Sequence, residues 1–412
     1  MTVLKNARVL NVDTPDDDQR YSVVVEGSEI REVTTGIAQF DGARQIDLAG
    51  KTVMPGMIDC HVHVIASIAH LGTNGKLPNT FAVLRAVPIL RGMLNRGFTT
   101  VRDAGGADYA LATAIGQEVI AGPRLFIAGK ALSQTGGHGD FRERFDSTDP
   151  DPCGCSRNLG AIGRIVDGVD EVRKAVREEM RSGAHHIKIM ASGGVASPTD
   201  PIGNLQYSVD EIRAIVEEAR SHQTYVMAHA YTGPAIKRAV ELGVRTIEHG
   251  NLVDDEAAAT MAKMGAYMVP TLVTYDAMSR VGAKTGVSAQ ALEKNEAVRV
   301  QGLAALELLK RHGVKMALGT DLLGDMHEFQ SDELRIRAKI LGNLEVLRQA
   351  TTIGAEVVGM PGKLGVVREG AMADLLVVDG DPLRDLSYLG GQGEGIRGVM
   401  KAGKWVREAL MN

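Results

Sequence analysis

Two histidines at the end of an apolar segment are the most informative chemical feature of the sequence. The segment 54–64 reads MPGMIDCHVHV and ends with His61 and His63, separated by one residue. Because side chains alternate between the two faces of a strand, both imidazoles are expected on one face, opposite Val62 and Val64. Two imidazoles at a strand end are suited to bind a divalent metal ion. An isolated HxH pattern is equally compatible with two polar residues bonded to the backbone.

Four further residues share this pattern of an apolar strand with a polar residue in it or at its C-terminal end. They are Lys188 in IKIMASGG, His229 in VMAHAY, His249 in TIEHGN and Asp321 in ALGTD. Each has a structural alternative: a snorkelling or ion-paired lysine, a bonded core histidine, or an aspartate that caps a helix. Their common position favours one metal site. Five histidines outside the pattern are predicted to lie on the surface: His70, His185, His222, His312 and His327.

Lys188 is predicted to bridge two metal ions as a carbamate. An ammonium group has no lone pair and cannot bind a metal. Burial near cations lowers the pKa of a lysine and leaves a nucleophilic amine, which adds carbon dioxide to give an anionic, bidentate carbamate. With this modification, the four histidines, Lys188 and Asp321 can hold two divalent ions. The ligand set suits Zn²⁺ and would also accept Mn²⁺ or Co²⁺.

The middle of the chain, 54–357, alternates between short apolar strands and amphipathic helices, which is typical of βα units. Strands are predicted at 57–64, 99–103, 124–128, 186–190, 225–229, 246–249, 267–270 and 315–320. Helices are predicted at 170–181, 209–223, 234–242, 256–264 and 291–312. Eight such units indicate an α/β fold with a (β/α)8 TIM-like barrel, in which chemistry lies at the C-terminal strand ends.

Both ends of the chain show the alternation of short antiparallel strands. Residues 358–412 include an apolar strand at 373–378 and a hairpin turn at 400–404. We therefore predict that 1–53 and 358–412 form one small β-sandwich beside the barrel. The Gly- and Asp-rich connection 132–167 is long enough to be a lid or binding loop.

The composition excludes several classes of protein. The chain of 412 residues is 44% hydrophobic and 24% charged, as in ordinary globular proteins, and its net charge of −5 gives no sign of a nucleic-acid or anionic-membrane partner. No apolar run is long enough for a membrane span, and the N-terminus lacks a signal-peptide pattern. Three cysteines are too few for a disulfide framework, so a cytoplasmic location is expected. Cys153 and Cys155 are expected to be free thiols.

These motifs resemble those of the amidohydrolase superfamily, in its binuclear subtype with a carboxylated lysine. The resemblance covers the whole chain, including the β-sandwich. Several phrases are similar to those of the prolidase-like branch, the Xaa-Pro dipeptidases: TVRDAGG, ALSQTGGHGD, PCGC, KIMASGGVASPTDP, AHAYT, RTIEHGNL, VPTLVTYDA and GTDLLG. The resemblance implies a homo-oligomer, with an octamer as one candidate. It also implies two zinc sites bridged by carboxylated Lys188, one with His61, His63 and Asp321 and the other with His229 and His249.

Two such ions would lower the pKa of a bridging water and give a hydroxide that attacks an amide carbonyl. Asp321 is predicted to be the general base and acid, and His138 to hydrogen-bond the carbonyl oxygen as it becomes negative. Tyr231 is predicted to bind the same oxygen or a substrate carboxylate, unless it only packs at the rim. The loop with Val195 and Thr199 is predicted to hold a terminal carboxylate through its N–H groups.

The leading prediction is a zinc-dependent amidohydrolase that cleaves dipeptides, first of all Xaa-Pro, or N-acyl amino acids with a free carboxylate. One alternative is an amidase for bulky N-aroyl amino acids of the ochratoxin type, and another is a cyclic-amide hydrolase like imidazolonepropionase. An inactive assembly protein on this fold would lack several ligands, whereas all six positions are filled here. Arg102 and Asp103, which end a strand, are predicted to be a structural pair.

Overall fold

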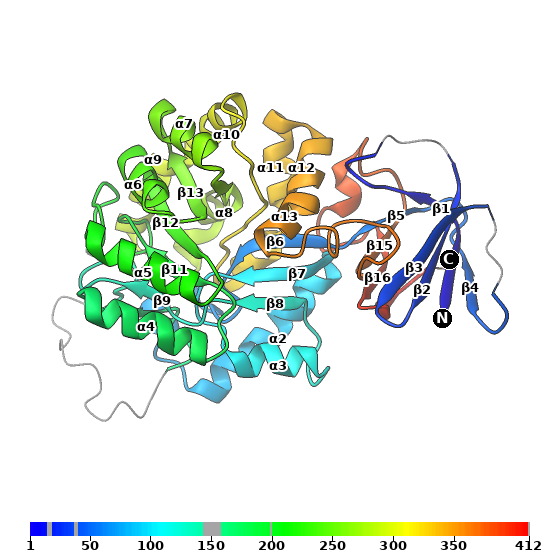
Figure 1. The fold of residues 1–412 in the computed structure, drawn as a ribbon, viewed down its shortest axis with the longest axis horizontal. Helices are drawn as coiled ribbons and strands as arrows, with labels where there is room; N and C mark the ends of the chain where they lie inside the picture. Colours follow the sequence, from blue (N-terminus) through cyan, green and yellow to red (C-terminus); the bar gives the residue numbers. More distant parts are fainter. Residues whose placement is uncertain (15–18, 37–39, 143–157, 198–199, 411–412) are drawn as a thin grey trace.

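The computed structural model describes residues 1–14, 19–36, 40–142, 158–197 and 200–410. These residues form a barrel surrounded by helices and, beside it, a sheet that contains both chain termini (Figure 1). Among the described residues, no helix is both long and apolar enough to cross a bilayer.

The barrel strands are parallel and form two hydrogen-bonded sheets. The first sheet contains β6 (Met57–Val62), β7 (Phe98–Asp103) and β8 (Arg124–Ile127). The second contains β10 (Gly163–Ile165), β9 (Ala131–Ser133), β11 (Ile187–Met190), β12 (Val226–Thr232), β13 (Thr246–Leu252) and β14 (Tyr267–Val269), in that order.

Backbone hydrogen bonds join these sheets into a ring. On one side, Met268 N of β14 donates to Lys315 O, and Cys60 N of β6 donates to Leu318 O, so 315–320 lies between the two strands. On the other side, His185 N, just before β11, donates to Ile127 O of β8 at 2.8 Å. The predicted α/β fold with a (β/α)8 barrel is confirmed. The eighth segment is less regular than predicted, because it forms only an isolated bridge between Met316 and Met268.

Helices cover the outside of the barrel (Figure 1). They are α1 (Leu71–Asn74), α2 (Asn79–Asn95), α3 (Tyr109–Gly116), α4 (Val169–Arg181), α5 (Val209–Ser221), α6 (Gly233–Glu241), α7 (Asp255–Met264), α8 (Leu272–Val281), α9 (Ala289–Arg299), α10 (Gly302–Arg311), α11 (Asp332–Leu341), α12 (Asn343–Ala350) and α13 (Thr352–Val357). Short 3-10 turns add η1 (Gly282–Lys284), η2 (Gly324–Phe329) and η3 (Leu386–Leu389).

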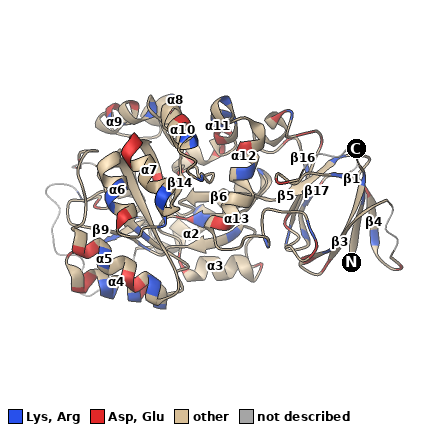
Figure 2. Ribbon diagram, turned by 45° about the horizontal axis from the view of Figure 1, so that its top comes forward, with Lys and Arg blue, Asp and Glu red and all other residues tan. Residues whose placement is uncertain are grey.

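The amphipathic patterns explain which faces these helices bury. α4 and α5 turn apolar residues inward and carry both signs of charge outside (Figure 2), where Arg173 pairs with Glu217 at 2.6 Å. The helix predicted at 291–312 is in fact α9 and α10. Gly302, the first residue of α10, packs closely against Leu272: a Cβ at Gly302 would lie 2.6 Å from the Leu272 side chain.

The terminal sheet has eight strands and draws on both ends of the chain. It contains β1 (Thr2–Val9), β2 (Tyr21–Glu26), β3 (Glu29–Thr35), β4 (Arg44–Asp47), β5 (Thr52–Pro55), β15 (Leu375–Val378), β16 (Ile396–Lys401) and β17 (Lys404–Glu408). β1 joins its two halves by pairing with both β2 and β5, and residues of both halves share one apolar core. The predicted hairpin turn is confirmed by the pairing of Lys401 with Lys404.

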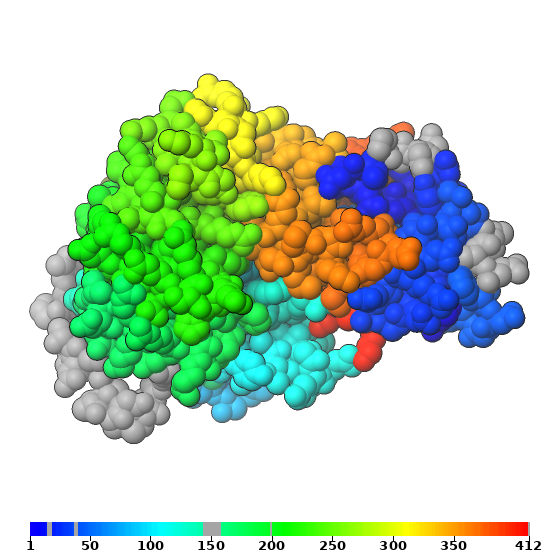
Figure 3. Space-filling view, in the orientation of Figure 1, coloured from blue at the N-terminus to red at the C-terminus, as the bar shows by residue number. Residues whose placement is uncertain are grey.

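The sheet leads directly into the barrel, because only Gly56 separates β5 from β6. A Cβ at Gly56 would lie 2.0 Å from the Thr99 hydroxyl, so this close approach requires glycine. The space-filling view shows the orange segment after α13 between the barrel helices and the blue N-terminal strands (Figure 3). The domain boundaries at 53/54 and 357/358 stay a prediction.

The connection 132–167 starts in β9 and returns as β10, which pairs with β9. Its central residues 143–157 lie outside the described part of the chain, so Cys153, Cys155 and the lid remain predictions. Cys60 is a buried free thiol.

Candidate active site

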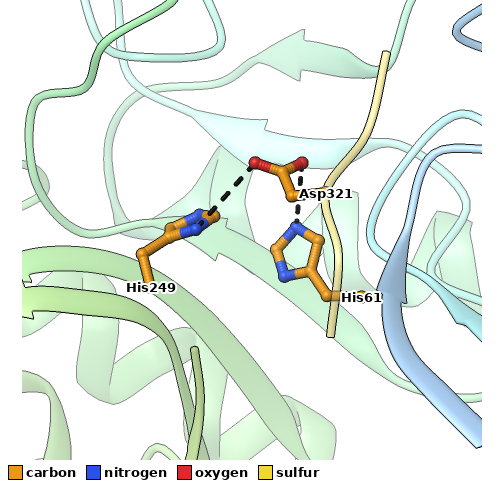
Figure 4. Close-up of side chains that lie close together, drawn as sticks. All are labelled: His61, His249 and Asp321. Atoms are coloured by element: carbon orange, nitrogen blue, oxygen red, sulfur yellow. Dashed lines mark ion pairs between the residues drawn. The ribbon is translucent and has the colours of Figure 1, made fainter. Parts of the chain in front are cut away.

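Five of the six predicted metal ligands form one group at the C-terminal ends of the barrel strands. The ring centroid of His61 lies 5.4 Å from that of His63 and 4.9 Å from that of His249. The ring centroids of His229 and His249 are 4.6 Å apart. Asp321 follows the last barrel segment and faces this row (Figure 4). Its carboxylate oxygens lie 3.4 Å from His61 Nε2, 3.3 Å from His63 Nε2 and 3.9 Å from His249 Nδ1.

Lys188, the sixth predicted ligand, lies in β11 and is only 1% exposed. Among the described residues no carboxylate lies within 4 Å of its Nζ, so Lys188 is not part of a close buried ion pair. Burial lowers the pKa of Lys188 to about 8, although the charges of Glu248 and Asp321 oppose this effect. The group is therefore a buried amine that loses its proton easily.

The donor atoms of this group fit a divalent metal ion. His61 Nε2 is buried and has no hydrogen-bond partner among the described residues. One donor atom each from His61, His249 and Asp321 lie within 4.8 Å of one another. Two imidazole nitrogens and a carboxylate oxygen are a donor set that zinc binds in proteins.

The ionisation states of His229, His249 and Asp321 also suit metal binding. Burial holds the pKa of His229 and of His249 well below the usual range, so both imidazoles are neutral and keep a lone pair. Burial would raise the pKa of Asp321, but the neighbouring imidazoles of His61 and His63 hold it well below its usual range. Asp321 is therefore an ionised carboxylate at neutral pH.

Two of these residues have a strained backbone. His249 has φ of +75° and Asp321 has φ of +52°, in the left-handed region. This conformation costs on the order of 1–3 kcal/mol in a residue other than glycine and persists where the surrounding structure enforces it. For Asp321, the backbone N–H donates to His61 O at 2.8 Å, which ties the two residues together.

A further set of contacts fixes the imidazole rings. His63 Nδ1 lies 2.8 Å from Gly105 O, and His249 Nδ1 lies 2.8 Å from Thr271 Oγ1. His61 Nδ1 lies 2.8 Å from Glu248 Oε2. Such partners orient metal-binding histidines and set their tautomers.

The residues predicted to contact substrate lie next to this group. His138 is buried, stacks on His229 at 4.1 Å between ring centroids, and places Nδ1 3.0 Å from Ser197 Oγ. Burial lowers the pKa of His138 to about 3, so the ring is neutral. Tyr231 is buried and stacks on His249 at 5.3 Å. Val195 is buried in the same apolar cluster as Tyr231. Thr199 lies outside the described residues.

The sequence matches the Amidohydrolase family model over residues 52–406. The chain belongs to the amidohydrolase family. It is 31% identical over 370 residues to ochratoxinase of Aspergillus niger, covering 85% of this chain and 75% of that protein. It is 25% identical over 392 residues to imidazolonepropionase of a Bradyrhizobium species, covering 85% and 84%. Among solved structures, a prolidase complexed with N-methylphosphonate-L-proline is 56% identical over 99% of both chains, with a TM-score of 0.97. The chain is thus a hydrolase that acts on amide C–N bonds.

A cavity of about 240 Å³ is lined by residues that are close in the chain to the site of this amidohydrolase, although none of them is a predicted metal ligand. Its lining is mostly apolar and includes Leu71, Phe141, Ala196, Met278 and Leu323. Met278 and Leu323 belong to the same apolar cluster as Val195 and Tyr231. The lining of the cavity is therefore suited to an apolar group.

Two predictions about other residues of this amidohydrolase are wrong. Arg102 and Asp103 do not pair with each other, because neighbouring strand residues point to opposite faces. The Arg102 guanidinium instead pairs with Glu248 at 2.9 Å, whereas Asp103 accepts backbone N–H groups, including that of Val64 at 2.9 Å. His327 is buried, with Nε2 3.1 Å from Ala66 O. His70, His185 and His222 are exposed, as predicted, and His312 is partly exposed.

Sequence reasoning missed Glu248, which contacts both His61 and Arg102. Its signal was the charged side chain within the apolar strand TIEHGN, directly before His249. Ser197 and Tyr275 were also missed, because their contacts with His138 and Tyr231 join segments far apart in the chain.

Proposed function

We propose that this amidohydrolase is a metal-dependent enzyme that cleaves Xaa-Pro dipeptides or N-acyl amino acids with a free carboxylate. The observation that carries the proposal is the convergence of His61, His249 and Asp321 around a buried imidazole nitrogen without a hydrogen-bond partner. The likeness to a prolidase complexed with a phosphonate derivative of proline supports the substrate class.

We assign the metal ligands as the sequence predicted them. His61, His63 and Asp321 would hold one ion, His229 and His249 the other, and a carboxylated Lys188 would bridge them. Zn²⁺ is the first choice of metal. Ions bound there would acidify water and polarise an amide carbonyl.

The side chains of the protein then move the protons and hold the substrate. Asp321, ionised at neutral pH, accepts a proton from the attacking water and passes it to the leaving nitrogen. His138 is neutral and donates from its ring to the carbonyl oxygen as negative charge develops. Tyr231 and the backbone N–H groups around Val195 and Thr199 hold the substrate carboxylate. The apolar cavity takes a side chain of the substrate.

A substrate panel tests this proposal. Purified protein would be assayed with Xaa-Pro and Xaa-Arg dipeptides, N-acyl-phenylalanine and an imidazolone. We expect Xaa-Pro to be cleaved with the highest kcat/KM. Hydrolysis of the imidazolone and of no other substrate in the panel would contradict the proposal.

A second candidate is an amidase for bulky N-aroyl amino acids, which the 31% identity to ochratoxinase favours. A higher kcat/KM with N-aroyl-phenylalanine than with Xaa-Pro dipeptides would favour this second candidate. A homo-oligomer, in the form of an octamer, and a cytoplasmic location are further proposals. Size-exclusion chromatography with light scattering tests the first.

A further inference from the structure

A buried chain of charges lies behind His61. Arg102 and Glu248 are both 0% exposed, and the Arg102 Nη2 group lies 2.9 Å from Glu248 Oε1 and 3.1 Å from Oε2. Arg102 also donates to Cys60 O at 2.7 Å and to Thr246 Oγ1 at 3.1 Å. These contacts hold the Arg102 guanidinium in one position. The guanidinium in turn holds the Glu248 carboxylate.

The two oxygens of Glu248 have different partners. Oε1 accepts from Thr246 Oγ1 at 2.6 Å and from Arg102. Oε2 lies 2.8 Å from His61 Nδ1 and also accepts from Arg102. Because Arg102 donates to both oxygens and Thr246 donates to Oε1, Glu248 lies among donors as a carboxylate and acts as an acceptor.

An acceptor at this position determines the tautomer of His61. Because Glu248 cannot donate, the hydrogen of a neutral His61 must lie on Nδ1, and Nε2 keeps its lone pair. Nε2 is the buried atom without a hydrogen bond, 3.4 Å from Asp321. We propose that Glu248, held by Arg102, is a positioning residue that keeps His61 Nε2 free to bind metal. This inference rests on the proposed function, since it needs the ion.

The isosteric variant Glu248→Gln gives a sharp test. Arg102 donates to both oxygens of Glu248, but Thr246 donates to Oε1 alone, so the amide oxygen of glutamine is expected at the Oε1 position. The amide NH₂ then faces His61 Nδ1 and donates to it, which moves the imidazole hydrogen to Nε2. That nitrogen must then give up its hydrogen before it can bind a metal ion. Loss of such a partner typically weakens metal binding about 10–100-fold.

The experiment is competition of Zn²⁺ between the purified full-length protein and a chelator, with binding stoichiometry. Wild type is expected to bind two ions per chain, and Glu248→Gln to bind one of them about 10–100-fold more weakly. In the double variant Arg102→Met/Glu248→Gln, the amide can turn its oxygen back to His61, so affinity should partly recover. Glu333→Gln is the matched control, because Glu333 forms an equally buried pair with Arg337 at 2.6 Å. It should lower thermal stability and leave zinc affinity unchanged.

Glu248→Asp covers the case in which Glu248→Gln does not fold. It keeps a charge beside Arg102 but withdraws the oxygen from His61, so zinc should again bind more weakly. Wild-type zinc affinity in whichever of these two variants folds would overturn the inference while leaving the proposed function intact. Absence of zinc binding by wild type would instead overturn the proposed function, and this inference with it.

Discussion

At the scale of single residues, Lys188 is the group whose ionisation matters most. Lys188 is buried and has no carboxylate within 4 Å among the described residues. Because burial disfavours the charged form, its pKa is lowered to about 8. Below that pH the group is an ammonium, which has no lone pair, and above it the amine can add carbon dioxide. If Lys188 is the proposed bridging ligand, the metal-free protein should form the carbamate only where the amine is deprotonated.

This state of Lys188 predicts how metal-free protein regains activity. At constant dissolved carbon dioxide, activity regained with zinc should rise as the pH passes upward through about 8. Lys188→Arg, which keeps the charge but cannot form the carbamate, should regain none. The measurement is amidase activity and bound zinc per chain after a fixed time. If the activity regained with zinc depended on neither pH nor carbon dioxide, the carbamate on Lys188 would be ruled out.

We assign His138 a separate role, next to the proposed metal ligands but outside their set. His138→Ala should lower kcat on the order of 100-fold, because one donor to the developing oxyanion is lost. Zinc content should not change. The exposed His185 provides the control, and His185→Ala should keep wild-type kcat. Loss of zinc from His138→Ala would mean that the ring serves the metal instead.

At the scale of elements, α9 holds the loop that follows β11. Lys294 of α9 donates to the carbonyl oxygens of Gly194, Ser197 and Asp200, at 3.1, 3.0 and 2.6 Å. The same loop carries Val195, and its Ser197 contacts His138. One lysine thus fixes a backbone segment that we assign to substrate binding.

Removing this lysine should loosen the loop and leave the barrel folded. Lys294→Met is expected to raise KM about tenfold, since three carbonyl groups lose a charged donor and the loop no longer keeps one conformation. The control is Lys237→Met, which removes a partly exposed lysine paired with Glu256 on the outer helices. Steady-state kinetics with Ala-Pro would detect the change. Equal KM values in the two variants would show that the loop does not position substrate.

The site residues at the strand ends could be predicted from the sequence. The contacts that these residues make with distant segments of the chain could not. His61, His63, His229 and His249 each follow a local apolar pattern, so their shared rim follows from the barrel itself. Glu248 has the same local signal as a misplaced charge, and its meaning depends on Arg102, which lies 146 residues away in the chain. The burial of His327 likewise depends on η2 packing over Ala66 O. Periodicity carries no information on such contacts.

At the scale of the whole molecule, the barrel and the terminal sheet share an apolar contact around Gly97. This glycine precedes β7 and has φ of +87°. A Cβ there would lie 2.8 Å from the Ile396 side chain and 2.9 Å from that of Leu376, both in the terminal sheet. The joint between the two parts is therefore closely packed.

Two glycine variants measure this joint. Gly97→Ala and Gly265→Ala both place alanine at positive φ, but a Cβ at Gly265 meets nothing within 4 Å. The strained backbone should cost about 1–2 kcal/mol of folding free energy in each. Gly97→Ala should lose roughly 1–3 kcal/mol more through overpacking, seen as a lower unfolding temperature. Equal unfolding temperatures of the two variants would show that the terminal sheet can shift to accommodate the added methyl group without loss of folding free energy.

Hydrolysis of Ala-Pro by metal-stripped protein during titration with zinc tests the central claim most directly. The account holds that six side chains from five strands of the barrel form one site for two ions. It predicts no turnover without zinc, and turnover that reaches its plateau at two zinc ions per chain. Full activity of the stripped protein, with zinc absent by elemental analysis, would contradict it.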